Sequence, residues 1–238
     1  MSLFPENVNF LSTARYIKGG RSTGSFVNFN LALHVNDKTD SVLENRSILR
    51  DYYELPSEPV WLNQIHSSIC VDVSLTEGVI EADASFSLNP GAVCSILTAD
   101  CLPVFVSKKD GTMVGIAHAG WKGLISGVIE NLIEAFDCSG EDLVVHLGPA
   151  ISKNFFEVGL EIKNLYLLKN INFARSFSTY RDKHYLDLYD AAKVILESFN
   201  IKFISGGDRC TFKESEEFFS YRRDGINSGR MAHLIWLT

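Results

Sequence analysis

Three phrases within residues 61–123 determine what the sequence predicts for this chain: Asn63-Gln64-Ile65-His66-Ser67, Thr98-Ala99-Asp100-Cys101-Leu102-Pro103 and His118-Ala119-Gly120-Trp121-Lys122-Gly123. Each phrase lies at the end of a short apolar run that has the length and composition of a buried β-strand, namely residues 60–65, 92–97 and 113–117. Because the backbone is well fixed where a buried strand ends, we expect one histidine, one cysteine and a second histidine to meet at a single point.

Two imidazoles and one thiolate form an N,N,S donor set, which suits zinc. A catalytic zinc site uses three protein ligands and leaves the fourth position open. A histidine or cysteine taken alone is more often structural, but the shared placement of His66, Cys101 and His118 favours a common site. We therefore predict these three as metal ligands and catalytic residues. The remaining histidines divide into two candidates for supporting groups, His34 and His146, and two that we interpret as structural, His184 and His233.

The composition indicates one folded domain over residues 1–238, since 46% of the residues are hydrophobic and the chain can bury a full core. A net charge of −7 argues against a nucleic-acid backbone as partner. A membrane span is not expected because Asp100 interrupts the longest apolar run. Five scattered cysteines without a CxxC pair, and an N-terminus without a signal pattern, are typical of a cytoplasmic protein with reduced thiols.

The order of apolar patterns predicts a mixed α/β fold. Strands are expected at residues 8–14, repeatedly between 60 and 119, and at 144–147, 203–204, 218–221 and 232–237, with helices at 40–53, 124–135, 157–168 and 188–199. The first helix has Ser41 and Glu44 at capping-box spacing. The second begins next to His118, where its free N–H groups favour a phosphate or a developing oxyanion.

Three charged residues have both a structural and a functional interpretation. Arg46 shares a helical stripe with Val42 and Leu49, so its guanidinium must reach solvent, pair with a carboxylate or point into a ligand cavity. Asp83 lies between small residues and is a candidate acid or base, although such an aspartate equally often closes a turn. Asp100 on a strand would point away from Cys101, and it either orients a neighbouring loop or caps a turn.

With these residues in hand, the chain resembles the laccase-domain family, also called the multicopper polyphenol oxidase-like family and associated with purine nucleoside phosphorylase activity. The resemblance covers nearly the whole chain in order, and its phrases around Cys101 and His118 are highly specific. The matching phrases are Phe29-Asn30-Leu31 with Leu33-His34-Val35, Asn45-Arg46, Gln64-Ile65-His66-Ser67, Thr98-Ala99-Asp100-Cys101-Leu102-Pro103-Val104, His118-Ala119-Gly120-Trp121-Lys122-Gly123, Leu147-Gly148-Pro149 and Ser220-Tyr221-Arg222-Arg223-Asp224.

The resemblance implies that His66, Cys101 and His118 correspond to the family's zinc and catalytic residues. It implies a single mixed α/β sandwich similar to the catalytic domains of cytotoxic necrotising factor toxins. The implied chemistry is phosphorolysis of adenosine, inosine and methylthioadenosine, with adenosine deamination as a second activity, by a monomer or homodimer whose partners are purine nucleosides and phosphate. Ala32 and Asn36 replace common glycines of the family, and Ser85-Phe86-Ser87 replaces a more aliphatic run, so selection of the base is the property most affected.

Further roles follow from position in or near the matching phrases. Phosphate binding is assigned to Arg46, Lys122 and Arg222, and hydrogen bonding of ribose or base to Gln64 and Asn30. Deamination also requires a carboxylate that transfers protons, for which Asp83 is the candidate.

Three alternatives differ in what they require. Copper oxidation of phenols needs a histidine-rich trinuclear cluster, and six histidines without a His-X-His pair do not supply it, so zinc is favoured over copper. A metal-free cysteine hydrolase would use His118 or His66 to activate Cys101, and editing of amino-acid-bearing cell-wall precursors belongs to this second class. A structural zinc in an interaction module would need a fourth protein ligand, for which no other residue is suitably placed.

Overall fold

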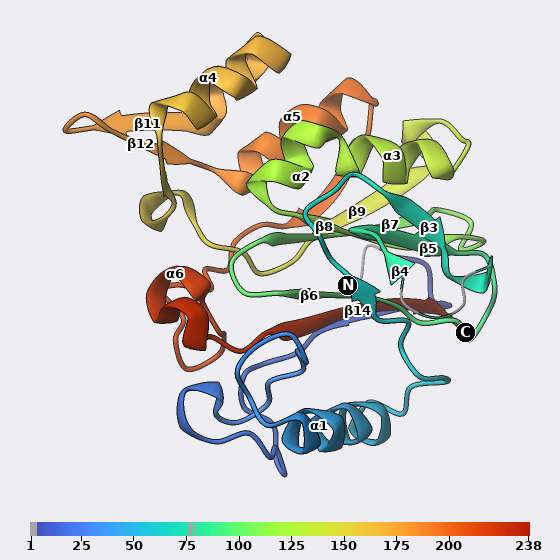
Figure 1. Cartoon of the computed structure of the whole chain (residues 1–238). Helices are drawn as coiled ribbons and strands as arrows, with labels where there is room; N and C mark the ends of the chain where they lie inside the picture. Colours follow the sequence, from blue (N-terminus) through green and yellow to red (C-terminus); the bar gives the residue numbers. More distant parts are fainter. Residues whose placement is uncertain (1–3, 76–77, 79) are drawn as a thin grey trace.

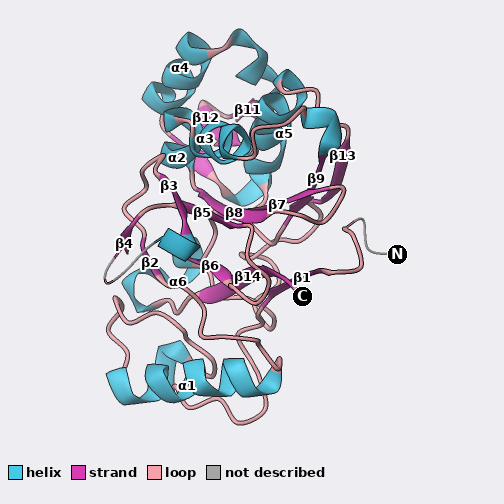
Figure 2. Ribbon diagram, turned by 90° about the vertical axis from the view of Figure 1, so that its right-hand side faces the viewer, coloured by secondary structure: helices cyan, strands magenta, loops and turns pink. Residues whose placement is uncertain are grey.

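The computed structural model describes residues 4–75, 78 and 80–238, and it consists of two stacked β-sheets with helices on both outer faces (Figure 1, Figure 2). The larger sheet has six strands in the order β13 (Phe203–Gly206), β9 (Leu143–Leu147), β7 (Leu102–Lys108), β8 (Val114–Ala119), β5 (Ala84–Ser87) and β3 (Cys70–Asp72). The smaller sheet has three, in the order β1 (Val8–Ser12), β14 (Met231–Leu237) and β6 (Cys94–Thr98).

The space between the two sheets holds one of the hydrophobic cores. Alternate side chains of a strand point to the same face, so Ile96 and Ile235 of the smaller sheet meet Phe105 and Ile116 of the larger sheet. The registers are antiparallel, with Met231 opposite Thr98 in the β14–β6 pair and Pro103 opposite His118 in the β7–β8 pair. These pairings bring the end of β6, the start of β7 and the end of β8 to the same edge of the sandwich.

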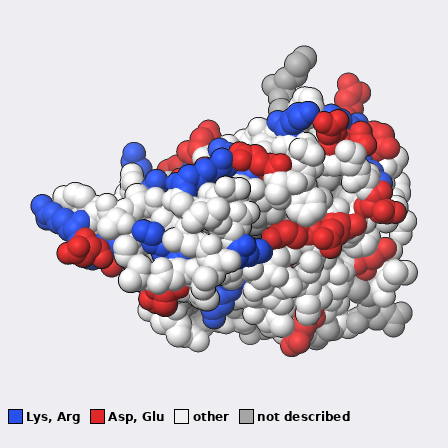
Figure 3. Space-filling view, turned by 90° about the horizontal axis from the view of Figure 1, so that it is seen from above, with Lys and Arg blue, Asp and Glu red and all other residues white. Residues whose placement is uncertain are grey.

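Helices complete the layers on both sides (Figure 1). The larger sheet is covered by α2 (Trp121–Ser126), α3 (Val128–Ala135) and α5 (Leu188–Ser198), and the smaller by α1 (Thr39–Tyr52). Leu49 of α1 packs in one buried cluster with Leu97 and Leu234 of the smaller sheet. Lys and Arg are intermingled with Asp and Glu on the surface seen from above in Figure 3.

The remaining elements are short. A small sheet of β10 (Glu157–Val158), β12 (Lys183–Leu186) and β11 (Phe177–Tyr180) projects from the body together with α4 (Leu160–Lys169) (Figure 1). In addition, β2 (Leu62–Asn63) pairs with β4 (Ile80–Glu81), and α6 (Tyr221–Asp224) precedes β14. Short 3-10 helices lie at Gly24–Phe26, Val73–Leu75, Gly140–Asp142, Lys153–Phe155, Ile171–Ser176 and Gly225–Asn227. Among the described residues, no helix combines the length and the apolar character needed to cross a membrane.

The predicted mixed α/β fold is observed, but three local predictions are wrong. The helix expected over residues 124–135 is divided by Gly127, whose φ of +97° is left-handed and ends α2 before α3 begins. Residues 218–221 do not form a strand, because Ser220 instead caps α6 by accepting a hydrogen bond from the N–H of Arg223. The first helix is preceded by Lys38, so the predicted capping box is absent and no side chain caps it. The likeness to cytotoxic necrotising factors stays a prediction.

Candidate metal centre

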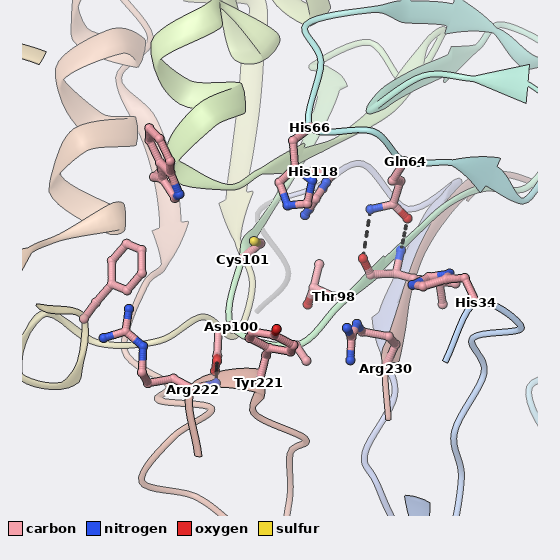
Figure 4. Close-up of a pocket in the computed structure, with 14 residues that line it drawn as sticks. His34, Gln64, His66, Thr98, Asp100, Cys101, His118, Tyr221, Arg222 and Arg230 are labelled. Atoms are coloured by element: carbon pink, nitrogen blue, oxygen red, sulfur yellow. Dashed lines mark hydrogen bonds between the residues drawn. The ribbon is translucent and has the colours of Figure 1, made fainter. Parts of the chain in front are cut away.

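The structure brings His66, Cys101 and His118 together at the shared edge of the sandwich (Figure 4). One ligand atom from each of the three lies within 4.8 Å of the others. His66 follows β2, Cys101 lies in the bend between β6 and β7, and His118 belongs to β8. The two imidazole ring centroids are 4.9 Å apart. The convergence expected from the three strand ends is therefore present.

The geometry of this group fits a zinc ion. In a tetrahedral site with bonds of about 2.0–2.3 Å, ligand atoms lie roughly 3.3–3.6 Å apart, so shifts of about 1 Å bring the three atoms onto one ion. A Cβ on Gly120 would lie 2.8 Å from Cys101 Sγ and 3.3 Å from a carbon of His66, so the glycine leaves the space that these side chains use. Within residues 4–75, 78 and 80–238 this is the one group of its kind, which fits one ion and not a multicopper cluster.

The carboxylate of Asp83 contacts two of the three candidate ligands, His66 and His118. Its carboxylate is fully buried and accepts hydrogen bonds from the N–H groups of Ile65, His66 and Ser67. The same carboxylate lies 2.8 Å from Nδ1 of His118, which leaves Nε2 to face Cys101. Burial acts to raise the pKa of Asp83, but the hydrogen bond and charge of His118 and the bonds from Ser67 outweigh it and hold that pKa at about 2. Asp83 is therefore an ionised positioning group.

Cys101 and His118 form a charge pair when no metal is bound. Burial acts to raise the pKa of Cys101, but the charge of His118 and hydrogen bonds from His118 and His66 lower it to about 6. Burial acts to lower the pKa of His118, and the Cys101 thiolate together with Asp83 raises it to about 9. The thiolate, the form that binds metals and attacks electrophiles, is thus available at neutral pH.

A cavity of about 540 Å³ opens in front of this group, within the size range of small-molecule sites (Figure 4). Aromatic side chains and three cationic or imidazole side chains share its wall with the candidate ligands. The lining residues are His34, Gln64, His66, Leu97, Thr98, Ala99, Asp100, Cys101, His118, Trp121, Phe156, Tyr221, Arg222 and Arg230.

Two of the predicted substrate residues line this cavity. Gln64 donates to the carbonyl of Leu97 at 2.9 Å and accepts from the N–H of Leu97 at 2.7 Å, so its amide ties the loop after β2 to β6. Arg222 donates to the carbonyls of Phe155 and Glu157, at 3.4 and 3.1 Å, and its guanidinium lies over the Phe156 ring.

The other predicted residues lie outside the cavity wall. Arg46 donates to the carbonyl of Leu31, and its guanidinium lies 3.9 Å from the centre of the Trp61 ring, while burial lowers its pKa to about 10. Lys122 is exposed beside Trp121, on a helix of only six residues whose macrodipole is correspondingly small.

Asn30 and Asp100 act on the backbone around the cavity. Asn30 is fully buried, and its Oδ1 accepts from the N–H of Arg230 at 2.9 Å. Asp100 is not on a strand, since its φ of +95° places it in the bend before β7, and this corrects the expected strand geometry. Its carboxylate accepts from the hydroxyl of Thr211 at 2.6 Å and the N–H of Arg222 at 2.7 Å, so the predicted loop-orienting role is confirmed.

The structure adds residues to the site that the sequence reasoning did not assign, chiefly Arg230, Tyr221 and Thr98. The sequence signal for Arg230 was its position directly before the largely apolar run of residues 231–237, which forms a buried strand. Of the two histidines predicted as supporting groups, His34 lines the cavity, whereas His146 lies outside its wall and bonds to Ser205.

Comparisons with known proteins find relatives over nearly the whole chain. The family described as multi-copper polyphenol oxidoreductase laccase matches residues 10–238. An Escherichia coli relative named purine nucleoside phosphorylase YfiH is 42% identical over 98% of this chain and 95% of its own. A Haemophilus influenzae relative named purine nucleoside phosphorylase is 37% identical with the same coverage, 98% and 95%.

Solved structures show the same fold. The crystal structure of a Neisseria meningitidis protein superposes with a TM-score of 0.93 at 41% identity, covering 98% of this chain and 96% of that one. A Bacillus licheniformis structure described as hypothetical protein YfiH gives a TM-score of 0.88 at 26% identity, covering 97% and 93%. The chain therefore belongs to the multi-copper polyphenol oxidoreductase laccase family, the family that its sequence phrases resemble.

Proposed function

We propose that this chain is a cytoplasmic, zinc-dependent purine nucleoside phosphorylase that acts on adenosine, inosine and methylthioadenosine, with adenosine deamination as a second activity. The observation that carries the proposal is the His66–Cys101–His118 group, which has no fourth protein ligand among the described residues and faces a cavity of suitable size. The names of relatives that are 37–42% identical support the phosphorylase activity. The five cysteines are free thiols, which suits a reducing compartment.

His66, Cys101 and His118 would hold the zinc, which when bound supplies a Lewis acid and lowers the pKa of a bound water toward about 7. Asp83 contributes by position: it keeps Nδ1 of His118 engaged and fixes the backbone that carries His66. Because Asp83 lies behind His118 and not in the cavity wall, its proposed part in proton transfer runs through His118.

The rest of the cavity suits a nucleoside. Trp121, Phe156 and Tyr221 line it and offer aromatic surfaces for a purine ring. In phosphorolysis a phosphate oxygen bonds to C1′ of ribose, the bond from C1′ to the base breaks, and the base nitrogen keeps the electron pair and takes up a proton. Gln64 and Arg222, which border this space, are the proposed contacts for the nucleoside and for charge on the reacting groups.

The test is incubation of the purified protein with adenosine, inosine and methylthioadenosine, each with and without phosphate, followed by chromatography of the products. Phosphorolysis releases free base and ribose 1-phosphate, or its methylthio derivative, only when phosphate is present. Deamination converts adenosine to inosine in either condition. Absence of product from every nucleoside would contradict the proposal.

One observation favours a second candidate, a metal-free cysteine hydrolase such as an editing enzyme for amino-acid-bearing cell-wall precursors. His118 lies between Cys101 and Asp83, as the base does between the nucleophile and the orienting carboxylate of a cysteine hydrolase. The pKa of the Cys101 thiol is also lowered. Elemental analysis separates the two. About one zinc per chain supports the phosphorylase, whereas a zinc-free protein that hydrolyses amide or ester bonds and loses this activity on alkylation of Cys101 supports the hydrolase.

A further inference from the structure

Arg230 is a cation of the cavity whose hydrogen bonds are only partly used. Its Nη1 donates to the carbonyls of Ser228 at 2.6 Å and Gly229 at 3.0 Å. No partner for its Nε or Nη2, and no carboxylate in an ion pair with it, occurs in the described part of the chain. The guanidinium extends into the cavity beside Tyr221 and Thr98 (Figure 4). The edge formed by Nε and Nη2 therefore remains available to a ligand.

That edge has the geometry that binds oxyanions. A guanidinium presents parallel N–H groups that match two oxygens of a phosphate or carboxylate. A partly buried cation without a counter-ion also carries a desolvation cost that a bound anion offsets, and burial lowers the pKa of Arg230. An anion at this edge would satisfy both the free donors and the unpaired charge.

The backbone of Arg230 is fixed before any ligand arrives. Its N–H donates to Oδ1 of the fully buried Asn30, and its carbonyl accepts from the N–H of Leu31 at 3.3 Å. Asn30 is held in turn by Asp37, which accepts from its amide at 2.9 Å. Asn30, which the sequence assigned to substrate binding, is therefore a positioning residue for Arg230, and the preset backbone reduces the entropy lost on binding.

The groups around Arg230 carry both signs of charge, because Cys101 and Asp100 favour its charged form while other basic side chains line the same cavity. His34 lines the same part of the cavity, and its pKa is lowered by burial and then by the charges of Arg230 and Arg46. The acidic side chain that lines the cavity, Asp100, is already bonded to Thr211 and to the backbone of Arg222. Arg230 has more free donors than Arg222, because both terminal nitrogens of Arg222 already donate to backbone carbonyls.

We propose that Arg230, assisted by His34, forms an oxyanion subsite beside the candidate metal centre and that inorganic phosphate is its ligand. The identification of phosphate rests on the proposed phosphorylase function, whereas the existence of an oxyanion subsite rests on the free guanidinium edge alone. The subsite lies across the cavity from His66 and His118 (Figure 4), so a nucleoside between them would meet phosphate on one side and the metal on the other.

The test measures binding of inorganic phosphate by calorimetry to the full-length wild type, Arg230→Gln, Arg230→Lys and a matched control, Arg181→Gln. Arg181 is an exposed arginine at the β11–β12 turn, so its loss removes the same charge far from the cavity wall. Loss of a bidentate charge-assisted pair is expected to weaken phosphate binding at least about tenfold in Arg230→Gln. Arg230→Lys keeps the charge but not the paired N–H groups, so its affinity for phosphate should lie between those of the wild type and Arg230→Gln. The Arg181→Gln control should bind phosphate as the wild type does.

Kinetics then separate this inference from the proposed function. Expected is a rise of at least about tenfold in the KM for phosphate in Arg230→Gln, with the KM for inosine within about twofold of wild type. A wild type that cleaves inosine, with the same phosphate KM in both Arg230 variants, overturns the subsite and leaves the phosphorylase intact. A wild type that binds phosphate through Arg230 yet cleaves no nucleoside overturns the phosphorylase and leaves the subsite intact. Thermal melting identifies any unfolded variant, and Arg230→Lys decides the matter if Arg230→Gln does not fold.

Discussion

This fold contains one buried histidine in a reactive setting and one in a structural setting. His118 lies at the candidate metal centre, and His233 lies in the core between the sheets. Their exposed fractions are 4% and 0%. His118 contacts the carboxylate of Asp83 and the thiol of Cys101, and its pKa rises to about 9 despite burial. His233 lies 2.8 Å from the hydroxyls of Thr98 and Ser12, and burial lowers its pKa to about 3. Burial alone keeps an imidazole neutral, and anionic partners reverse that effect.

The largest effect is expected when the Cys101 thiolate is removed from its pair with His118. In Cys101→Ser we expect the zinc content of the purified protein to fall and product formation from inosine to drop at least about 100-fold, because the hydroxyl remains protonated and is a poor zinc ligand. The measurements are elemental analysis and chromatography. Cys138→Ser is the matched control, since Cys138 lies after α3 and away from the cavity. Equal activity in both variants would remove Cys101 from the reaction.

Removing the carboxylate behind His118 is expected to act mainly on stability. Asp83→Ala leaves three backbone N–H groups and His118 without their acceptor. We expect a loss of about 3 kcal/mol or more in the free energy of unfolding, measured with urea. Asp110→Ala is the control, because that aspartate is exposed and, among the described residues, bonds only within its own turn. A loss below about 1 kcal/mol in Asp83→Ala would show that the buried carboxylate does not organise the site.

The opposite pKa shifts predict opposite pH dependence in metal-free protein. His118 has a raised folded-state pKa, so its contribution to stability is complete below its unfolded pKa of 6.5 and is lost as pH rises through about 9. Over the same range the lowered pKa of Cys101 gives the opposite slope, so the charge of His118 is best measured at its own ring. The NMR signals of the His118 imidazole, assigned by their absence in His118→Gln, should show a protonated ring at pH 7 that titrates near pH 9. A ring that titrates at or below pH 6.5 would contradict the charged state assigned to His118.

The smallest effect is expected at His233. Because its pKa is lowered, the unfolded chain binds a proton that the folded chain does not, and stability is lost as pH falls below 6.5 towards 3. His233→Gln keeps hydrogen-bonding capacity toward Ser12 and Thr98 and removes this titration. Its stability should therefore decline less than that of the wild type between pH 6.5 and 4, as judged by melting temperature. Parallel declines would show that His233 does not titrate in this way.

The candidate ligands were predictable because each lies at the end of a recognisable apolar run, although the strands β2, β6 and β8 that lead to them belong to three different sheets. The role of Arg46 was not predictable from the sequence. Helical periodicity places its side chain on one face of the helix but does not show that the guanidinium stacks on Trp61. The pairing of β14 with β6 and the packing of the segment around Asn30 bring Arg230 and His34 into one cavity. Such contacts between distant segments depend on the tertiary fold, which local patterns do not encode.

X-ray absorption at the zinc edge of the zinc-loaded protein shows directly whether the three candidate ligands bind one ion. If His66, Cys101 and His118 share one ion with an open position, the spectrum should show four neighbours: one sulfur at about 2.3 Å and three nitrogen or oxygen atoms at about 2.0–2.1 Å, one of them not from the protein. Cys101→Ser should lose the sulfur shell. A wild-type spectrum without sulfur, or with more than one sulfur per zinc, would contradict a shared site of His66, Cys101 and His118.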